Sequence, residues 1–147
     1  MNTYVIERFL TAQDNPPAGC GSYEQALSEM KNGRKTGHWM WYIFPQLRGL
    51  GQSSMSYIYG LAGLEEAEAY LANTTLKSRL YELCEILLKH KDKSAVDIFG
   101  DVDTMKLKSS MTLFALTSED YTIFDQVLEQ FFDGEMDELT LKLINES

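Results

Sequence analysis

The fold class is set by one stretch of the sequence, TLKSRLYELCEILLKH at residues 75–90. Its leucines recur at steps of four, three and four residues: Leu76, Leu80, Leu83 and Leu87. Because an α-helix repeats every 3.6 residues, this spacing places all four side chains on one face. The stretch therefore predicts a long amphipathic helix that buries its leucine face, with Cys84 packed inside it.

The residues that follow continue the helical pattern. Three further helices are predicted, over residues 103–115, over residues 118–134 and from residue 137 onward. Asp103 is the expected N-cap of the first of these helices, and Ser118 opens the second. Ser94 and Asp97 are expected to cap a brief turn before them.

The preceding residues are also helical in pattern. Four helices are predicted there, over residues 3–13, 22–30, 54–59 and 64–72. Ser22, followed three residues later by Gln25, has the pattern of a capping box. We therefore predict an all-α fold, a single compact domain over residues 1–147 with seven or eight helices and one irregular, aromatic-rich segment in its middle.

The helical period is lost from residue 36 to residue 53, and four aromatic side chains lie between residues 39 and 44. Most of this irregular part belongs to GRKTGHWMWYIFPQLRGLG at residues 33–51, called the central segment below. Pro45 disfavours helical geometry at Phe44, so a helix there would end earlier. A short buried strand, a helical turn and an irregular loop all fit this pattern.

The charge is unevenly distributed along the chain. The net charge is -9, and residues 119–147 hold nine acidic side chains against one lysine. Residues 29–51, in contrast, hold four basic side chains against one acidic one. This positive region suits an anionic small molecule, whereas a nucleic-acid duplex would also meet the acidic end and be repelled.

Several classes of protein are not indicated. Cys20 and Cys84 are too few for a disulfide framework, and two histidines 52 residues apart without an HExxH pattern predict no metal. The chain lacks a G-x-x-x-x-G-K-[ST] loop, and no cofactor is expected. No apolar run suits a membrane span, and Glu7 and Arg8 interrupt the segment that would form a signal peptide. A cytoplasmic location is expected.

The central segment carries the residues best suited to bind a ligand. Trp39 and Trp41 beside His38 predict an aromatic wall on which a purine or another flat group can stack. Donors for a phosphate group lie nearby: Lys35, Gln46 and Arg48. The alternative is that the aromatic side chains only fill the core and that a backbone carbonyl binds His38.

Several stretches resemble one bacterial family. They are RFLTAQ at residues 8–13, the central segment with its HWMWYIFPQL string, EAEAYL at 66–71 and IFGDVDTMKLKSSMTLF at 98–114. On these stretches the chain is identified as a member of the family catalogued as domain of unknown function 1810. Some members carry a calpastatin label, which no residue here supports. The resemblance implies a small, mainly helical domain without an established activity.

The family resemblance also implies a set of site residues. They are Gln13, Tyr23, Glu29, Lys35, His38, Trp39, Trp41, Gln46, Arg48, Lys106, Ser109 and Ser110. Several are polar residues that core packing alone does not require, so we predict that they line one pocket. Glu29 and His38 are the catalytic candidates in this set, and the others are candidates for ligand binding.

A second similarity, through SYEQAL at residues 22–27 and the later IFG turn, is to the NADAR group of enzymes that act on ADP-ribose-type N-glycosides. It implies hydrolysis or transfer at a ribosyl carbon, with Glu29 or His38 as general acid or base. We therefore predict a pocket for an anionic, nucleotide- or ADP-ribose-like ligand, with N-glycosidic hydrolysis as its candidate chemistry. The alternative is a noncatalytic module that docks a protein partner through an exposed aromatic segment. A monomer and a dimer are both compatible with the sequence.

Overall fold

The structure is a computed structural model that describes residues 5–146. The helices in this range are α1 Glu7–Asp14, α2 Tyr23–Lys31, α3 Met40–Ile43, α4 Ser54–Tyr59, α5 Leu64–Ala72, α6 Thr74–Lys89, α7 Ala95–Thr117, α8 Ile123–Phe132 and α9 Glu138–Glu146. Residues 5–146 contain no strand, only an isolated parallel bridge between Leu47 and Leu61. The all-α prediction is therefore confirmed. The predicted start of the first helix, at Thr3, lies outside the described residues.

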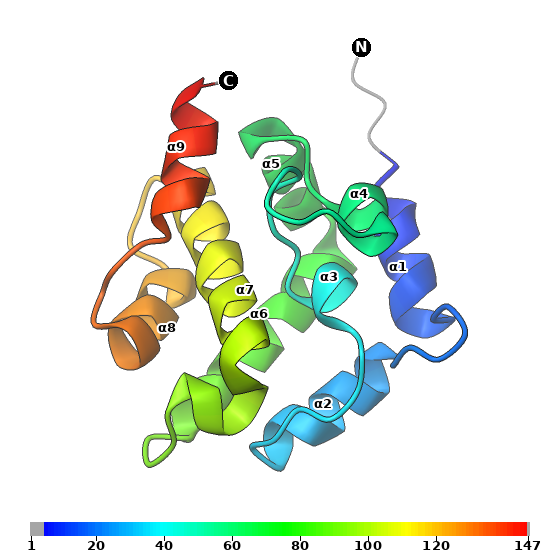
Figure 1. Cartoon of the computed structure of the whole chain (residues 1–147), viewed down its shortest axis with the longest axis vertical. Helices are drawn as coiled ribbons and strands as arrows, with labels where there is room; N and C mark the ends of the chain where they lie inside the picture. The colour runs from blue at the N-terminus through cyan, green and yellow to red at the C-terminus, as the bar shows by residue number, and fades with distance from the viewer. Residues whose placement is uncertain (1–4, 147) are drawn as a thin grey trace.

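The helices are arranged around α6 and α7, which cross the middle of the molecule (Figure 1). Helix α8 packs against both of them, and α9 lies against α7. Helix α5 contacts α6 and α7, α2 contacts α6, and α1 contacts α2 and α3. The central segment, drawn in cyan, leaves α2 and runs beside α7 before it reaches α4 (Figure 1).

The leucine face of α6 is buried as predicted. Leu76, Leu80, Leu83 and Leu87 are each at most 1% exposed, and truncation of such a side chain to alanine costs about 2–5 kcal/mol. Cys84 on the same helix is fully buried and free, and burial raises the pKa of its thiol. The long periodic helix is therefore a core element of the fold.

Helix α7 includes both the brief capped turn before Gly100 and the helix that the sequence predicts after it, and its second part begins before Asp103 and ends at Thr117 instead of Ala115. The Ser94 hydroxyl accepts from the Asp97 amide, and the Asp97 carboxylate accepts from the Ser94 amide. Gly100, with φ 78° and ψ 173°, is not helical, so α7 consists of two helical stretches that meet at a kink. Asp103 is therefore not an N-cap, because it lies inside α7 and its carboxylate pairs with lysines.

Helix α8 begins later than predicted. Ser118 follows α7 as its C-cap, and the N-cap of α8 is Thr122. Thr122 and Asp125 form a capping box. The Asp125 carboxylate accepts from the Thr122 amide at 2.8 Å, and the Thr122 hydroxyl accepts from the Phe124 amide at 3.2 Å. The capping box pairs the Thr122 and Phe124 amides, which have no partner within the helix, so α8 starts at Thr122.

The central segment forms only the short helix α3, which ends at Ile43, before Pro45, as expected. Its aromatic side chains point inward: Tyr42 and Phe44 are fully buried, and Trp39 is 1% exposed. The Phe44 ring meets the Phe99 ring edge-on at 6.0 Å. These side chains fill the core between the N-terminal helices and α7, which confirms the packing interpretation for them.

Candidate functional site

One pocket lies between the central segment and α7. It has a volume of about 320 Å³ and is partly open to solvent. Five of the predicted site residues line it: Lys35, His38, Trp39, Trp41 and Lys106. Cys20, Met40, Ser53, Met55 and Asp103 complete the lining. The pocket thus joins residues from the loop before α2, the central segment, the start of α4 and α7.

A single carboxylate joins the two lysines of the pocket. Lys35 Nζ lies 2.7 Å from one oxygen of Asp103, and Lys106 Nζ lies 3.5 Å from the other. Lys35 also donates to the Gly37 carbonyl at 2.5 Å, and its side chain is only 7% exposed. The Lys106 side chain is 29% exposed. Two ammonium groups against one carboxylate leave an excess of one positive charge, and Lys106 is the more accessible cation.

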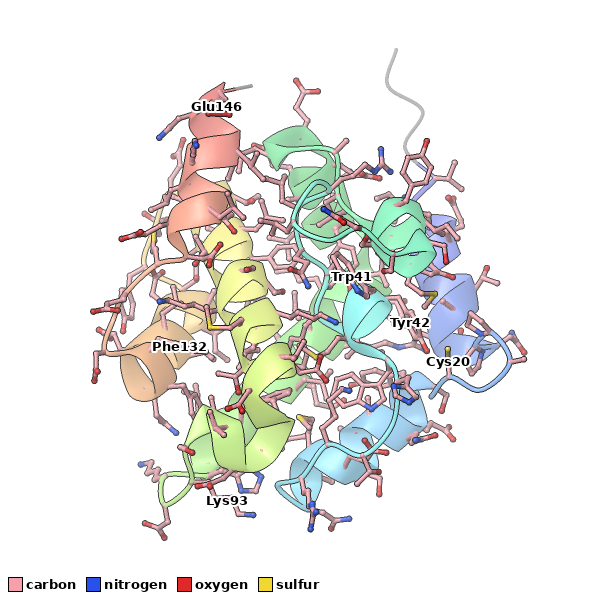
Figure 2. All side chains as sticks on the ribbon, in the orientation of Figure 1. Cys20, Trp41, Tyr42, Lys93, Phe132 and Glu146 are labelled. Carbon is pink, nitrogen blue, oxygen red and sulfur yellow. The ribbon has the colours of Figure 1, made fainter. Side chains whose placement is uncertain are left out.

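The two indoles have different surroundings. Trp39 is sealed in the core, where its Nε1 donates to Glu29 at 2.9 Å and Lys35 Nζ lies 4.9 Å from its ring centroid. Trp41 is 8% exposed, and Lys106 Nζ lies 5.6 Å from its ring centroid (Figure 2 labels Trp41). Of the predicted aromatic wall, Trp41 therefore provides the more accessible part, while Trp39 is a core residue.

His38 lies at the exposed side of the pocket. Its backbone carbonyl accepts from the Gly21 amide at 3.0 Å, which holds the loop before α2 against the central segment. Its imidazole makes no hydrogen bond or ion pair within residues 5–146, so no backbone carbonyl binds it.

Glu29 lies behind the pocket and is fully engaged. Its two oxygens accept five hydrogen bonds, from the amides of Thr36 and Gly37, the Thr36 hydroxyl, the Gln25 amide and Trp39 Nε1. Burial by itself would raise the pKa of Glu29, but these hydrogen bonds outweigh burial and lower the pKa from 4.5 to about 2. Glu29 is thus a permanently ionised anchor for the loop that carries Lys35 and His38.

Gln13 and Tyr23 lie away from the pocket, beside Arg79. The Gln13 side chain donates to the Tyr42 carbonyl at 2.8 Å and accepts from Arg79 at 2.9 Å. The Tyr23 hydroxyl donates to Glu82, and the Arg79 guanidinium lies 4.9 Å from the Tyr23 ring centroid. Burial, followed by the bond to Glu82, raises the pKa of Tyr23. Both side chains connect α6 to the N-terminal part of the fold.

The remaining predicted residues do not line the pocket either. Arg48 donates to the Tyr57 carbonyl at 3.2 Å and borders a separate surface groove with Tyr57 and Ile58. Ser109 is nearly buried and donates to the Met105 carbonyl at 3.1 Å. Gln46 and Ser110 are buried in the interior. The prediction that all these residues surround one cavity is therefore wrong. The Arg48 amide donates to the Leu61 carbonyl, and the Arg48 side chain borders the other groove. Ser109 lies on a buried side of α7.

Sequence reasoning missed Cys20, Met40, Ser53, Met55 and Asp103. A signal for Asp103 was present, since it lies three residues before Lys106 and shares a helix face with it. For Cys20, Ser53 and Met55 no local pattern identifies the site. Their place depends on contacts between segments distant in the chain, such as the bond between Gly21 and His38.

The chain belongs to the DUF1810 family of proteins of unknown function, whose model matches residues 3–144. It is also similar to the crystal structure of the conserved hypothetical protein Rv1873 from Mycobacterium tuberculosis. The two chains are 40% identical, with a TM-score of 0.88, and the match covers 95% of this chain and 96% of the other. No curated protein matches the chain significantly. The similarity to the NADAR group thus finds no support.

The length and hydropathy of the helices show whether any of them could cross a membrane. Across residues 5–146, no helix combines the length and the apolar character that crossing a membrane requires. The longest helix, α7, carries charged side chains throughout its middle, including Asp103, Lys106 and Lys108.

Proposed function

We propose that this protein binds a small anionic ligand with a flat or apolar body, such as a nucleotide, in the pocket between the central segment and α7. The observation that carries this proposal is that Lys35 and His38 meet Lys106, about seventy residues further along the chain, around one cavity. An apolar cavity with a few convergent polar groups is the usual composition of a small-molecule site.

The size and charge of the pocket narrow the proposal. A volume of about 320 Å³ is at the lower end of the range of roughly 300–1,000 Å³ for small-molecule pockets. This favours a ligand of mononucleotide size over a complete ADP-ribose. Lys106 is the better phosphate contact, because Lys35 is nearly buried and already held by Asp103 and the Gly37 carbonyl.

The chemistry we propose for a catalytic version of this site is hydrolysis of an N-glycosidic bond, with His38 transferring the proton. Such a reaction needs a group that protonates the leaving base or deprotonates water. The free imidazole of His38 meets this need, whereas the carboxylate of Glu29 is occupied by five donors and holds no proton at neutral pH. Glu29 would therefore position the loop rather than react.

A noncatalytic module that docks a partner through exposed aromatic side chains is the weaker proposal. Such docking needs a contiguous apolar surface. Trp39, Tyr42 and Phe44 are buried, so the aromatic part of the central segment offers no such surface. The pocket is the better-supported binding site.

A thermal-shift titration with AMP, ADP-ribose, NAD and inorganic phosphate tests the binding proposal. We expect AMP at millimolar concentration to raise the melting temperature, because a ligand that binds only the folded state stabilises it. Lys106→Met should abolish the shift. Lys108→Met is the matched control and should retain it, since Lys108 faces Glu135 at 3.8 Å and the Phe132 ring. The proposal fails if none of the four compounds raises the melting temperature.

Release of free base from mononucleotides, followed by chromatography, tests the catalytic version separately. We expect wild-type protein to release base and His38→Ala to lose at least a hundredfold of this rate at an unchanged melting temperature. If the protein binds the ligand but releases no base, the binding proposal stands and the proposal of N-glycosidic hydrolysis is rejected.

A further inference from the structure

Among the residues in the range 5–146 that line the pocket between the central segment and α7, Asp103 alone carries a carboxylate. Its side chain is 21% exposed. A carboxylate is an unexpected member of a site for anions, because it repels the ligand that the two lysines attract. The position of Asp103 in the pocket therefore affects which anions can bind there.

The Asp103 carboxylate is fixed in the pocket by Lys35. Oδ2 of Asp103 lies 2.7 Å from Lys35 Nζ, and the Lys35 side chain is only 7% exposed. Lys35 is held in turn by the Gly37 carbonyl, and its ammonium group lies 4.9 Å from the Trp39 ring centroid. If Asp103 turned away from a ligand, it would leave this nearly buried cation without its counter-ion, which is a costly change. The negative charge of Asp103 thus stays in place when a ligand binds.

Lys106 is held more loosely. Its Nζ lies 3.5 Å from Oδ1 of Asp103, longer than the roughly 2.7–2.9 Å of a charge-assisted hydrogen bond. Since the Lys106 side chain is also 29% exposed, its ammonium group can turn to an anion in the pocket. An anion in direct contact with Lys106 then lies within about 6 Å of Oδ1 of Asp103. This distance is shorter than the Debye length of about 8 Å, so salt leaves much of the repulsion by Asp103 unscreened.

The charges of the pocket balance one negative charge on a ligand. With His38 neutral, Lys35 and Lys106 contribute two positive charges and Asp103 one negative charge. Glu29 does not line the pocket, and five donors already compensate its carboxylate. A ligand with one negative charge leaves the pocket neutral, whereas a ligand with two leaves one negative charge uncompensated. An uncompensated charge is costly in a partly enclosed site with apolar walls.

We propose that Asp103 is a specificity-determining residue, which makes the pocket favour ligands with one negative charge over ligands with two. The ligand class that fits is a nucleoside phosphodiester, in preference to the phosphomonoester of the same nucleoside. Discrimination of this kind comes from a repulsive group placed against the disfavoured ligand. The inference rests on the proposed function, because it concerns the same pocket, and it adds the charge of the phosphate group that Lys106 contacts.

Isothermal titration calorimetry with adenosine 5′-methylphosphate and with AMP tests this inference. At pH 8 the methyl ester carries one negative charge and AMP carries two, since the second ionisation of a phosphate monoester has a pKa of about 6. We expect the wild-type protein to bind the methyl ester about tenfold more tightly than AMP. Asp103→Asn removes the repulsion, so the ratio of the two dissociation constants should shift about tenfold toward AMP.

Asp101→Asn and Asp103→Glu are the matched controls. Asp101→Asn removes the same charge from an exposed position on α7 outside the pocket lining, whereas Asp103→Glu keeps the charge inside it. Both variants should retain the wild-type ratio within about threefold.

The preference of the wild-type protein is measured without any substitution, so it tests the inference even if Asp103→Asn does not fold. Tighter binding of AMP than of the methyl ester by wild type overturns the inference, and so does an unchanged ratio in folded Asp103→Asn. In both cases the proposed binding function stands. Absence of binding of both compounds would overturn the binding function together with the inference.

Discussion

At the scale of single residues, Glu29 organises the loop that leads to the pocket. A buried carboxylate is costly unless several donors compensate it, and here five donors from residues 25–39 converge on two oxygens. Two of these hydrogen bonds hold the backbone amides of Thr36 and Gly37, directly after Lys35. The position of Lys35 and His38 therefore depends on a residue that does not line the cavity.

The variant Glu29→Gln is expected to destabilise the fold by about 3 kcal/mol at pH 7, because it removes the charge that the donors compensate and replaces one acceptor oxygen with an NH2 group. If the remaining oxygen keeps the position of Oε1, the NH2 group faces the Gln25 side-chain amide and the Thr36 hydroxyl, which lose their acceptor. Chemical denaturation measures the change. Glu24→Gln on the exposed side of the same helix is the control and should shift stability by less than about 0.5 kcal/mol. Equal effects of the two substitutions would refute an anchoring role.

The pKa of Glu29 makes the difference in stability between wild type and Glu29→Gln depend on pH. Its value in the folded protein is about 2, below the ordinary 4.5, so the folded state favours the ionised form. The stabilisation is complete above about pH 4.5 and is lost as the pH falls toward 2. Denaturation of wild type and Glu29→Gln across this window should show the stability gap narrowing with acidification. A gap that stays constant from pH 5 to pH 2.5 would contradict the assignment.

At the scale of elements, α7 joins a capped first part to the part that carries the pocket residues Asp103 and Lys106. Its first turns are fixed by the Ser94–Asp97 capping box, and the kink at Gly100 sets the direction of the turns that carry Asp103 and Lys106. Gly100 has φ 78° and ψ 173°, a region that only glycine occupies readily. Within residues 5–146, apart from its neighbours in α7, no atom lies within 4 Å of a side chain added at Gly100, so the constraint on this residue is conformational and not steric crowding.

Gly100→Ser is therefore expected to destabilise the protein by about 1–3 kcal/mol, measured by denaturant unfolding. Gly63→Ser provides a matched comparison, since Gly63 also has open space around it but has extended backbone angles and caps α5. Serine is a good N-cap, so this second variant should be neutral or more stable. A Gly100→Ser protein as stable as Gly63→Ser would show that the kink is not under conformational constraint.

At the scale of the whole molecule, contacts between distant parts of the chain connect the N-terminal helices to α6. Gln13 on α1 bonds Arg79 at 2.9 Å, and the His90 ring lies 2.6 Å from the Met30 carbonyl at the end of α2. The central segment in turn reaches α7 through Asp103. Such contacts couple the stability of the two halves, so we propose that the chain folds as one domain.

The single-domain proposal predicts one cooperative thermal transition. Helix content followed by far-ultraviolet circular dichroism should be lost at the same temperature as the tryptophan fluorescence of Trp39 and Trp41, because the central segment and the helices share one core. Agreement within about 2 °C is expected for a two-state unit. Two separated transitions would indicate independent units.

Local patterns in the sequence were sufficient for much of the fold. The leucine face of α6, the bounds of α4 and α5, the Ser94–Asp97 cap and the end of α3 before Pro45 all follow from neighbours within a few residues. The predicted start of α8 at Ser118 was wrong, because the N-cap of this helix is Thr122. The chemistry of helix repeats and caps is short-range, so a single sequence carries it.

Only the tertiary structure decided the composition of the pocket. The sequence by itself determined an all-α chain with a basic, aromatic central segment, but it did not distinguish Trp41, the more accessible indole of the pocket, from Trp39, which is almost completely buried. The sequence also did not predict that Arg48 lies outside the pocket or that Cys20 and His38 both line it. Nor did it predict that Asp103 pairs with two lysines. These outcomes depend on which segments distant in the chain touch one another, and that is settled by the packing of the whole core.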